Sequence, residues 1–434
     1  MYLNSLKIHN LRCFEEATLE LQYPGRKNGA ERFPNINVLL GNNGAGKSTV
    51  LKAIALATLS PVITQSGYVP YHLIRRTHLK ESLPREAKIS ASVILHDQDA
   101  DLPKKNSPRR NISLLVTRMG DSDFEVLEGK HYSPSSQKGA ELWQNMYDDK
   151  SPSFFVVGYG ATRSVEEAEN YKPQELQKAR RLRYQRVAGL FENMITLTPL
   201  YPWLLQLERD NKGRYTQVVA LINKLLPEGA KLTSRFLKNE YLFSIGKAEV
   251  PFSALSDGYR AFIGWVADLL YHLCNSCPPG KRLVEIRGIV LVDEIDLHLH
   301  PEWQRWVVPR ISAYLPNLQF VFSTHSPIVT SSVMKENVFV MEADPLGVSS
   351  IEQYDERTYG LTAEQMLLSS YFNLTTTRGE PFEDELEELS IRARGGDIDA
   401  ALAFMLKASG EESVGRQRNK RSGGKKSRKF KNGG

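Results

Sequence analysis

Cysteine is scarce in this sequence, with three residues in 434, too few for a disulfide framework. The first ten residues lack the basic segment and the apolar run of a signal peptide. No window reaches 18 consecutive apolar residues, and the most apolar stretch, 261–274, is interrupted by Asp268 and His272. We therefore expect a cytoplasmic protein without a membrane-spanning segment.

The sequence also lacks the biased composition of fibrous or disordered chains. Hydrophobic residues make up 41% and charged residues 24%, with 30 Gly and 22 Pro, close to the averages of globular proteins. At roughly 150 residues per domain, this length predicts two or three folding units. No long heptad run is present, which excludes a coiled-coil arm.

Positive charge is concentrated at the end of the chain. The formal net charge is +6, but residues 415–434 hold nine Lys and Arg and no acid, so the remainder carries −3. Such a segment buries too little apolar surface to fold, and we expect a disordered basic tail over 411–434. Two roles stay open for it, a solubilising tail or a non-specific phosphate tether.

The strongest motif is a glycine-rich loop between a buried strand expected at 36–40 and a helix expected at 49–59. Its glycines let backbone N–H groups converge on phosphate oxygens, its lysine brings charge to the β- and γ-phosphates, and its serine hydroxyl can bind Mg²⁺. The loop therefore predicts ATP and Mg²⁺ as cofactors. Its candidate nucleotide-binding residues are Gly41, Asn42, Asn43, Gly44, Ala45, Gly46, Lys47, Ser48 and Thr49.

A second motif ends another buried strand, expected at 288–292. Asp293 and Glu294 emerge where that strand ends, and in an open α/β sheet this edge lies beside the phosphate loop. We expect Ser48 to bind Mg²⁺, Asp293 to hold the ion through water, and Glu294 to polarise the attacking water, because phosphoryl transfer needs positioning and charge neutralisation.

The motifs between and after these two resemble those of ABC-type ATPases. Residues 255–260 resemble the signature motif, with Asp257 at the usual first glycine and Tyr259 where glutamine is common. Residues 293–301 resemble the acid pair and D-loop, and 323–326 the switch-histidine segment. The resemblance implies an ATP-dependent dimer in which Ser256 and Gly258 address the γ-phosphate bound to the partner's phosphate loop. It also implies that His325 senses that phosphate, so the expected catalytic residues are Glu294, His325 and Lys47.

The beginning of the chain indicates which branch of the ABC-type ATPases the sequence resembles. Residues 6–14 are similar to the start of the RecF, SMC and OLD-type branch, where Arg12 would pack beside the nucleotide. Residues 158–163 and 293–304 resemble ATPases of bacterial anti-phage modules, such as PtuA of Septu and the retron-associated ATPases. No TOPRIM nuclease is expected after the switch histidine, although Asp397 and Asp399 mimic its D-x-D pattern.

Three weaker patterns leave their alternatives open. His298 and His300 have a metal-ligand spacing but no evident third ligand, and they fall in the D-loop-like stretch. The pair Cys274 and Cys277 has no second pair, which disfavours a zinc or redox site. Residues 158–163 stand where transporter-type domains carry a magnesium-contacting glutamine, which is missing here, so Arg163 is either a phosphate or partner contact or part of a structural salt bridge.

Together these patterns predict an α/β fold, an ABC-type P-loop head with a mainly parallel sheet, an antiparallel β subdomain and a helical insertion. The expected divisions are an N-terminal ATPase lobe at 1–163, the helical insertion at 164–250, a C-terminal ATPase lobe at 251–345, a helical region at 346–410 and the basic tail at 411–434.

The resemblance implies a function in two alternative forms. In the first, the chain is the sensor and scaffold of a defence module, a dimer or higher homo-oligomer that controls a separate effector such as a nuclease. In the second, it is a RecF-like repair ATPase whose closed dimer clamps duplex DNA. The negative charge outside the tail makes DNA or RNA binding less attractive.

Overall fold

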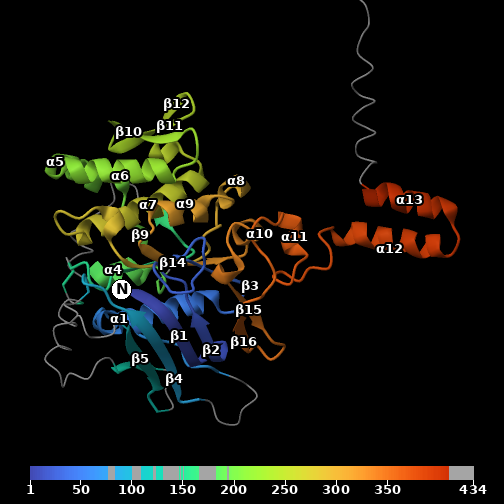
Figure 1. Cartoon of the computed structure of the whole chain (residues 1–434), viewed down its shortest axis with the longest axis horizontal. Helices are drawn as coiled ribbons and strands as arrows, with labels where there is room; N and C mark the ends of the chain where they lie inside the picture. The colour runs from blue at the N-terminus through green and yellow to red at the C-terminus, as the bar shows by residue number, and fades with distance from the viewer. Residues whose placement is uncertain are drawn as a thin grey trace, which may run out of the picture. The chain divides into compact units, whose positions relative to one another are not determined.

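The computed structural model describes residues 1–76, 84–99, 109–120, 124–130, 146, 148–149, 151–165, 182–192 and 195–409. These residues form two compact units, one spanning Met1–Asn373 and one beginning at Leu374 (Figure 1). The predicted basic tail lies outside the described residues. None of the helices described is both long enough and apolar enough to cross a bilayer.

A six-stranded sheet forms the centre of the first unit, in the order β16-β15-β3-β14-β13-β7. Neighbouring strands are parallel except for the edge pair β15 and β16. The strands are β3 (Ile36–Gly41), β7 (Val156–Tyr159), β13 (Gly288–Val292), β14 (Leu318–Thr324), β15 (Val338–Ala343) and β16 (Ser349–Glu352).

The central strands are apolar along their whole length because both faces of the sheet are covered. In β13, Val290 and Val292 belong to one hydrophobic core, whereas Ile289 and Leu291 belong to the other. This alternation assigns successive residues to opposite faces, as the two-residue period of a strand requires. The sequence pattern of an uninterrupted apolar run therefore has a direct structural cause.

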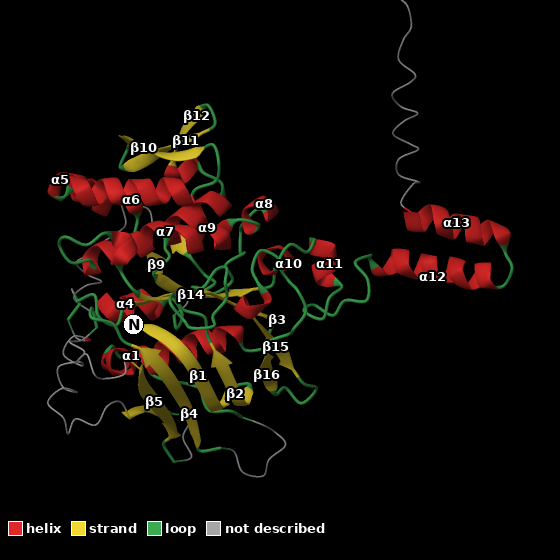
Figure 2. Ribbon diagram, in the orientation of Figure 1, coloured by secondary structure: helices red, strands yellow, loops and turns green. Residues whose placement is uncertain are grey.

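Helix α1 (Lys47–Gln65) lies between the central sheet and a five-stranded antiparallel sheet, in the order β2-β1-β4-β5-β6 (Figure 2). That second sheet contains β1 (Tyr2–Leu11), β2 (Phe14–Glu20), β4 (Glu86–Ile94), β5 (Arg109–Arg118) and β6 (Glu125–Lys130). It is the predicted antiparallel β subdomain. Helix α4 (Leu182–Ala188) packs against α1 and β7 on the same side.

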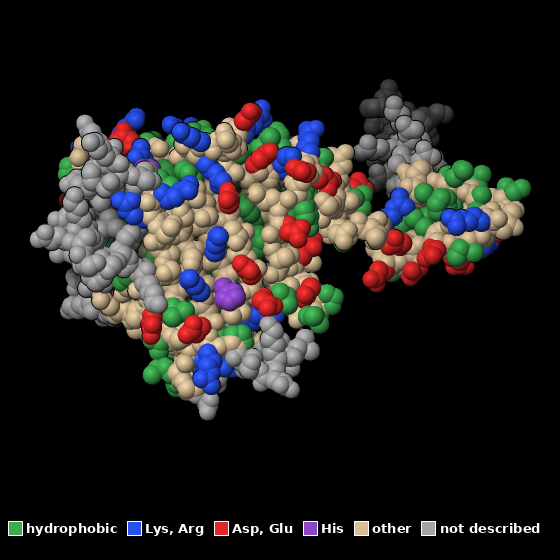
Figure 3. All heavy atoms as spheres, turned by 60° about the horizontal axis from the view of Figure 1, so that its bottom comes forward, with side chains coloured by type: hydrophobic (Ala, Val, Ile, Leu, Met, Phe, Trp, Pro, Cys, Tyr) green, Lys and Arg blue, Asp and Glu red, His purple; other side chains and the backbone are tan. Residues whose placement is uncertain are grey.

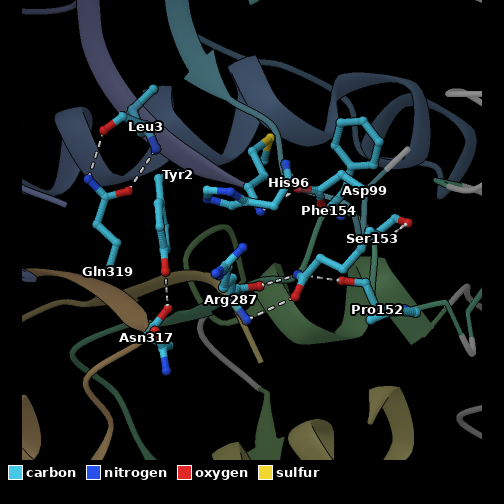
Figure 4. A network of polar contacts seen from close by, with 12 residues as sticks. Tyr2, Leu3, His96, Asp99, Pro152, Ser153, Phe154, Arg287, Asn317 and Gln319 are labelled. Carbon is cyan, nitrogen blue, oxygen red and sulfur yellow. Dashed lines mark hydrogen bonds and ion pairs between the residues drawn. The ribbon is translucent and has the colours of Figure 1, made fainter. Parts of the chain in front are cut away.

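Polar side chains join the two sheets where β1 and β14 begin (Figure 4). The side-chain amide of Gln319 accepts from the backbone N–H of Leu3 and donates to its carbonyl oxygen, both at 2.7 Å. The hydroxyl of Tyr2 donates to the carbonyl of Asn317 at 2.7 Å. These bonds satisfy buried backbone groups that neither sheet pairs, and they fix β1 relative to β14.

The opposite face of the central sheet is covered by helices and a three-stranded antiparallel sheet. A short parallel pair, β8 and β9, lies next to α7. The elements of this part are β8 (Ser164–Val165), β9 (Thr196–Leu197), α5 (Leu200–Asp210), α6 (Lys212–Leu225), β10 (Ala230–Leu237), β11 (Glu240–Ile245), β12 (Ala248–Pro251), α7 (Asp257–Ser276), α8 (Pro301–Gln304) and α9 (Val307–Tyr314).

Two short helices complete the first unit, α10 (Pro327–Thr330) and α11 (Ala363–Leu367). In the second unit, α12 (Glu380–Arg394) and α13 (Ile398–Ser409) pack as a helical hairpin. An ion pair between Lys407 and Glu385 joins the two helices. Arg392 closes the turn between them through its ion pair with Asp397 at 2.8 Å.

The predicted fold class is confirmed, and three segments differ in detail from their expected form. The helical insertion expected at 164–250 also contains the strands β8, β9, β10 and β11, and 166–181 and 193–194 lie outside the described residues. The helix expected at 49–59 extends to Gln65 past a kink at Leu59. Residues 349–352 form a sheet strand, so the region after 345 is not purely helical, and the first compact unit ends at Asn373.

Candidate functional site

The phosphate loop requires glycine at its two ends. Gly46 has a φ of 101°, and a Cβ there would lie 2.6 Å from the sulfur of Cys13 and from the ring of Phe14. A Cβ on Gly41 would lie 2.3 Å from the carbonyl oxygen of Met341. The loop is thus pressed between the β1–β2 turn and β15, where only glycine fits.

The loop exposes part of its backbone and buries the rest. Asn42, Asn43 and Gly44 are exposed, whereas Ala45, Lys47 and Thr49 are buried. The Lys47 ammonium donates to the carbonyls of Gly41 and Asn42 at 2.7 and 3.0 Å. Burial lowers the pKa of Lys47, and the nearby carboxylates of Asp293, Glu294 and Asp296 oppose this shift. Its charge is therefore held at the mouth of the loop.

Ser48 and Asp293 meet although 245 residues separate them. The Ser48 hydroxyl donates to Oδ2 of Asp293 at 2.6 Å. The other carboxylate oxygen, Oδ1, accepts from the hydroxyl of Ser323 on the neighbouring strand β14. A hydroxyl and a carboxylate in contact at a sheet edge are oxygen donors of the kind Mg²⁺ prefers, so this pair fits the ion that the sequence predicts.

Glu294 has an unusual backbone conformation. Its φ of 49° is left-handed, which costs a non-glycine residue about 1 kcal/mol or more. Its N–H donates to Ser323 Oγ at 2.7 Å. On the other side, Arg163 donates to the carbonyls of Asp293 and Glu294 at 3.0 and 2.6 Å. Ser323 and Arg163 thus hold the peptide units that carry the two acids.

His325 follows the last residue of β14 and is half-buried. Burial lowers the pKa of His325, and the positive charge of Lys47 lowers it further, against the opposing effect of Asp296. The imidazole is therefore neutral near pH 7 in the absence of a bound anion. A triphosphate next to it would favour the protonated form.

The signature-like segment contacts the D-loop of its own chain. Ser256 is the exposed residue before α7, and no hydrogen bond from its side chain caps the helix. A Cβ on Gly258 would lie 2.6 Å from the carbonyl oxygen of His298, so glycine permits this close approach. Asp257 forms an ion pair with Arg260. The first turn of α7 thus leaves an exposed serine hydroxyl beside free backbone N–H groups, an arrangement suited to an anion.

Arg12 lies directly after β1 in a left-handed conformation, with a φ of 49°. Its N–H donates to the carbonyl of Leu73 at 2.8 Å. Burial lowers the pKa of Lys52 on α1, and the charge of Arg12 lowers it further, which places these two cations near one another. The segment after β1 therefore brings positive charge to the helix that follows the phosphate loop.

Sequence reasoning missed several residues that support the site. Ser323 bridges the two acids, yet in the sequence it is only the first residue of the switch-histidine segment. The carbonyl of Tyr159 accepts from the N–H of Asp293 at 2.8 Å, and its hydroxyl donates to buried Asp268 on α7 at 2.9 Å. In the sequence, this contact was signalled by a tyrosine at the end of an apolar strand, β7, and by an acid, Asp268, within the apolar helix α7.

The weaker candidates have other roles. His300 caps α8, its Nδ1 accepting from the N–H of Glu302 at 3.3 Å, and His298 is exposed. Burial raises the pKa of Cys274 to about 12, which disfavours the thiolate that zinc needs. Across the described ranges, no cluster of three or more His, Cys, Asp or Glu could hold a metal. Within the described part of the chain, Arg163 bonds to the backbone carbonyls of Asp293 and Glu294 and to no carboxylate.

Comparisons with known protein families give two matches. A model described as an AAA domain matches residues 5–228. A second AAA-domain model, described by reference to the AbiEii toxin and type IV TA systems, matches residues 208–331. Together they cover the phosphate loop, the signature-like segment, the acid pair and His325.

Two curated proteins are similar over most of the chain. The Septu protein PtuA of Bacillus mycoides (strain KBAB4) is 24% identical over 379 residues, covering 87% of this chain and 45% of its own length. The "Retron Vc95 probable ATPase" of Vibrio cholerae serotype O1 biovar El Tor is 23% identical over 361 residues, covering 71% of this chain and 69% of its own. The chain thus spans less than half of the PtuA protein.

Among solved structures, an SMC head bound to the C-winged helix domain of ScpA covers 82% of this chain and 98% of its own. The TM-score is 0.50 and the sequence identity is 15%. This likeness concerns the fold, which matches the sheets and helices described above.

Proposed function

The chain belongs to the AAA-domain family. From this premise we propose that it is an ATP hydrolase of the RecF and SMC branch, which hydrolyses ATP between two copies of itself to control a separate defence effector. One arrangement carries the proposal. Ser48 and Asp293 are in contact at the carboxyl edge of the central sheet, next to Lys47 and Glu294.

Binding begins with the phosphate loop. We propose that Lys47 exchanges the carbonyls of Gly41 and Asn42 for the β- and γ-phosphates, a stronger charge-assisted contact. The exposed N–H groups of residues 42–44 and the N-terminus of α1 surround the same anion. Ser48 and Asp293 would hold Mg²⁺, which supplies neutralisation of the phosphate charge when bound.

Hydrolysis depends on the acid after Asp293. Glu294 accepts a hydrogen bond from the attacking water and orients it toward the γ-phosphorus. A carboxylate in this role contributes about 10²–10⁴-fold to the rate. His325, neutral before nucleotide arrives, donates to the γ-phosphate and reports its presence to β14.

The second copy supplies the remaining anion site. Ser256 and the first turn of α7 point to a γ-phosphate held by the partner, because their own chain leaves them exposed. A phosphate shared by two chains couples nucleotide occupancy to association. The proposed unit is therefore an ATP-closed dimer, from which a higher homo-oligomer can be built.

Glu294→Gln tests the dimer. We expect it to bind MgATP, to lose at least about 100-fold in turnover, and to sediment as a dimer with MgATP and as a monomer without it. Glu128→Gln is the control, since Glu128 is exposed on β6 of the other sheet. Monomers of Glu294→Gln at saturating MgATP would refute the proposal.

The output of hydrolysis is proposed to be a conformational change passed to an effector. The described residues after β15 include β16, α11, α12 and α13. The relatives named Septu PtuA and retron ATPase support a role in anti-phage defence. We propose a nuclease as the effector and the cytoplasm, where ATP and phage nucleic acid meet, as the place of action.

Expression with the neighbouring gene tests the effector. The wild-type chain should co-purify with that gene product and protect cells in a plaque assay. Glu294→Gln should keep the complex but lose the protection, whereas Glu128→Gln should keep both. A chain that co-purifies with no neighbour and protects alone would contradict a separate effector.

A clamp on duplex DNA is the competing function. The part of the chain outside residues 415–434 has a net charge of −3, and on the face in Figure 3 acidic and basic side chains are interspersed. A clamp predicts DNA-stimulated hydrolysis and binding that weakens steeply with salt even after deletion of 415–434. The defence proposal predicts that this deletion removes any DNA or RNA affinity.

A further inference from the structure

Arg163 occupies the segment where transporter-type domains carry a glutamine, and among the described residues its side chain bonds to no carboxylate oxygen. Its Nη1 donates to the carbonyl of Asp293 at 3.0 Å and its Nη2 to the carbonyl of Glu294 at 2.6 Å. The guanidinium therefore grips two consecutive peptide groups at the end of β13. A planar fork with two parallel donors is suited to this task, and a single ammonium is not.

The conformation of Glu294 explains why such a grip is needed. With a φ of 49°, the residue is in a region that side chains larger than glycine adopt only when the surroundings hold them. Ser323 Oγ accepts the N–H of Glu294, and Arg163 binds its carbonyl. Both ends of the residue are fixed, so the direction of its Cα–Cβ bond is fixed as well.

The guanidinium of Arg163 also lies near three carboxylates. Asp293, Glu294 and Asp296 all lie near the guanidinium and stabilise its positive charge, which burial disfavours. Conversely, one buried cation reduces the repulsion among three carboxylates that lie within the four residues 293–296. Arg163 thus places a positive charge beside the three acids before nucleotide binds.

The segment that carries Arg163 is itself firmly seated. A Cβ on Gly160 would lie 2.1 Å from the carbonyl oxygen of Gly189, and one on Gly158 would lie 2.4 Å from Leu190, directly after α4. The Tyr159 carbonyl accepts from the N–H of Asp293 at 2.8 Å. Within residues 158–163, Tyr159 therefore binds the N–H of Asp293, and Arg163 binds the carbonyls of Asp293 and Glu294.

We propose that Arg163 is a positioning residue for hydrolysis: its two bonds to backbone carbonyls hold Glu294 in the left-handed conformation that aims the carboxylate at the attacking water. This inference rests on the proposed catalytic role of Glu294. It assigns to Arg163 neither a phosphate contact nor a partner contact.

The test separates turnover from binding. Arg163→Ala should lower kcat for MgATP about 10–100-fold, the loss typical of a misplaced catalytic group, while KM and the Kd of a fluorescent ATP analogue change less than about 3-fold. Arg163→Lys should keep the charge and the fold but regain little of kcat, because one ammonium cannot bind two carbonyls in a fixed plane. Full rescue by lysine would overturn the proposed fork.

A double-substitution cycle with Glu294→Gln identifies the residue through which Arg163 acts. In the Glu294→Gln background, Arg163→Ala should lower the residual rate less than 3-fold, since the group it positions is already gone. Equal losses in both backgrounds would overturn the proposal. If Glu294→Gln alone retains wild-type turnover, the proposed catalytic role fails instead, so the two failures are distinguishable.

Arg214 provides a matched control. It is also a buried arginine that donates to backbone carbonyls, those of Lys281 and Pro278 at 2.9 and 3.4 Å, and it lies on α6. Arg214→Ala should lower the melting temperature without changing kcat. A similar loss of kcat in Arg214→Ala and Arg163→Ala would show that general destabilisation causes both, and would overturn the positioning role.

Discussion

The hydroxyl of Ser48 donates to Oδ2 of Asp293 at 2.6 Å, joining the start of α1 to the end of β13. The hydroxyl proton points to the carboxylate, so the lone pairs of the Ser48 oxygen remain available to Mg²⁺. The bond is therefore compatible with the proposed ion site, in which Ser48 would contact Mg²⁺ and Asp293 would hold it through water.

Asp293→Asn should change the requirement for the metal. The amide keeps a hydrogen-bonding partner for Ser48 but is a poorer Mg²⁺ ligand, so half-maximal ATPase activity should need at least about 10-fold more Mg²⁺. ATP binding in EDTA should be unchanged. The measurement is a Mg²⁺ titration at saturating ATP, and coincident curves for the two proteins would exclude Asp293 as a ligand.

Ser256→Ala should spare ATP binding and reduce turnover, because the hydroxyl acts on nucleotide held by the partner. Lys47→Ala should lose at least about 100-fold in ATP affinity, since it removes a charge-assisted contact in a partly buried loop. When the two variants are mixed, one pocket of the mixed dimer has a native lysine and a native serine. Partial recovery of activity on mixing is expected, and its absence would count against a shared pocket.

Tyr159→Phe should weaken the link between β7 and the signature helix. Burial alone would raise the pKa of Asp268, but His272 and the N–H of Thr198 outweigh it and lower that pKa, so the carboxylate is ionised. Removing the Tyr159 hydroxyl takes one donor from this buried anion and should cost about 1–3 kcal/mol. Urea denaturation measures the loss. An unchanged midpoint would mean that water replaces the hydroxyl.

His96 should make stability sensitive to acid. Burial and neighbouring positive charges lower the pKa of His96 to about 4, whereas an unfolded histidine titrates near 6.5. The unfolded chain binds the proton first, so stability present above pH 6.5 is lost as the pH falls toward 4. Because His96 is partly exposed, solvent screens part of this effect. Between pH 7 and pH 5, the free energy of unfolding should therefore fall by about 1 kcal/mol more in the wild type than in His96→Phe. Chemical denaturation at several pH values measures this difference. The same pH dependence of the free energy of unfolding in both proteins would contradict the lowered pKa of His96.

The contact between the phosphate loop and the acid pair was predictable from the sequence for a topological reason. Each motif follows an apolar run that is buried on both faces, and parallel strands bring their carboxyl ends to one edge. Val38 and Val290 show the pattern directly, since both are fully buried. Local residue types and their order were sufficient for this part of the site.

The supporting contacts were not predictable, because they depend on positions that only the folded chain defines. Nothing in the sequence near Glu294 indicates a left-handed φ, and residue types alone do not show that Arg163 binds carbonyl oxygens instead of a carboxylate. Ser323 differs from other serines in lying near the end of β14, the strand beside β13. The same holds for β16, whose four residues gain their pairing from β15.

The closeness of Gly46 to the β1–β2 turn has a consequence for isotope exchange. The sulfur of Cys13 lies 2.6 Å from the position that a Cβ on Gly46 would take. The carbonyl of Cys13 accepts from the amide of Ser349 on β16 at 2.9 Å. Filling the loop with phosphate would restrain Cys13 and so slow deuterium uptake at that amide. Ser349, at the outer edge of the central sheet, would then report occupancy of a pocket that it does not touch.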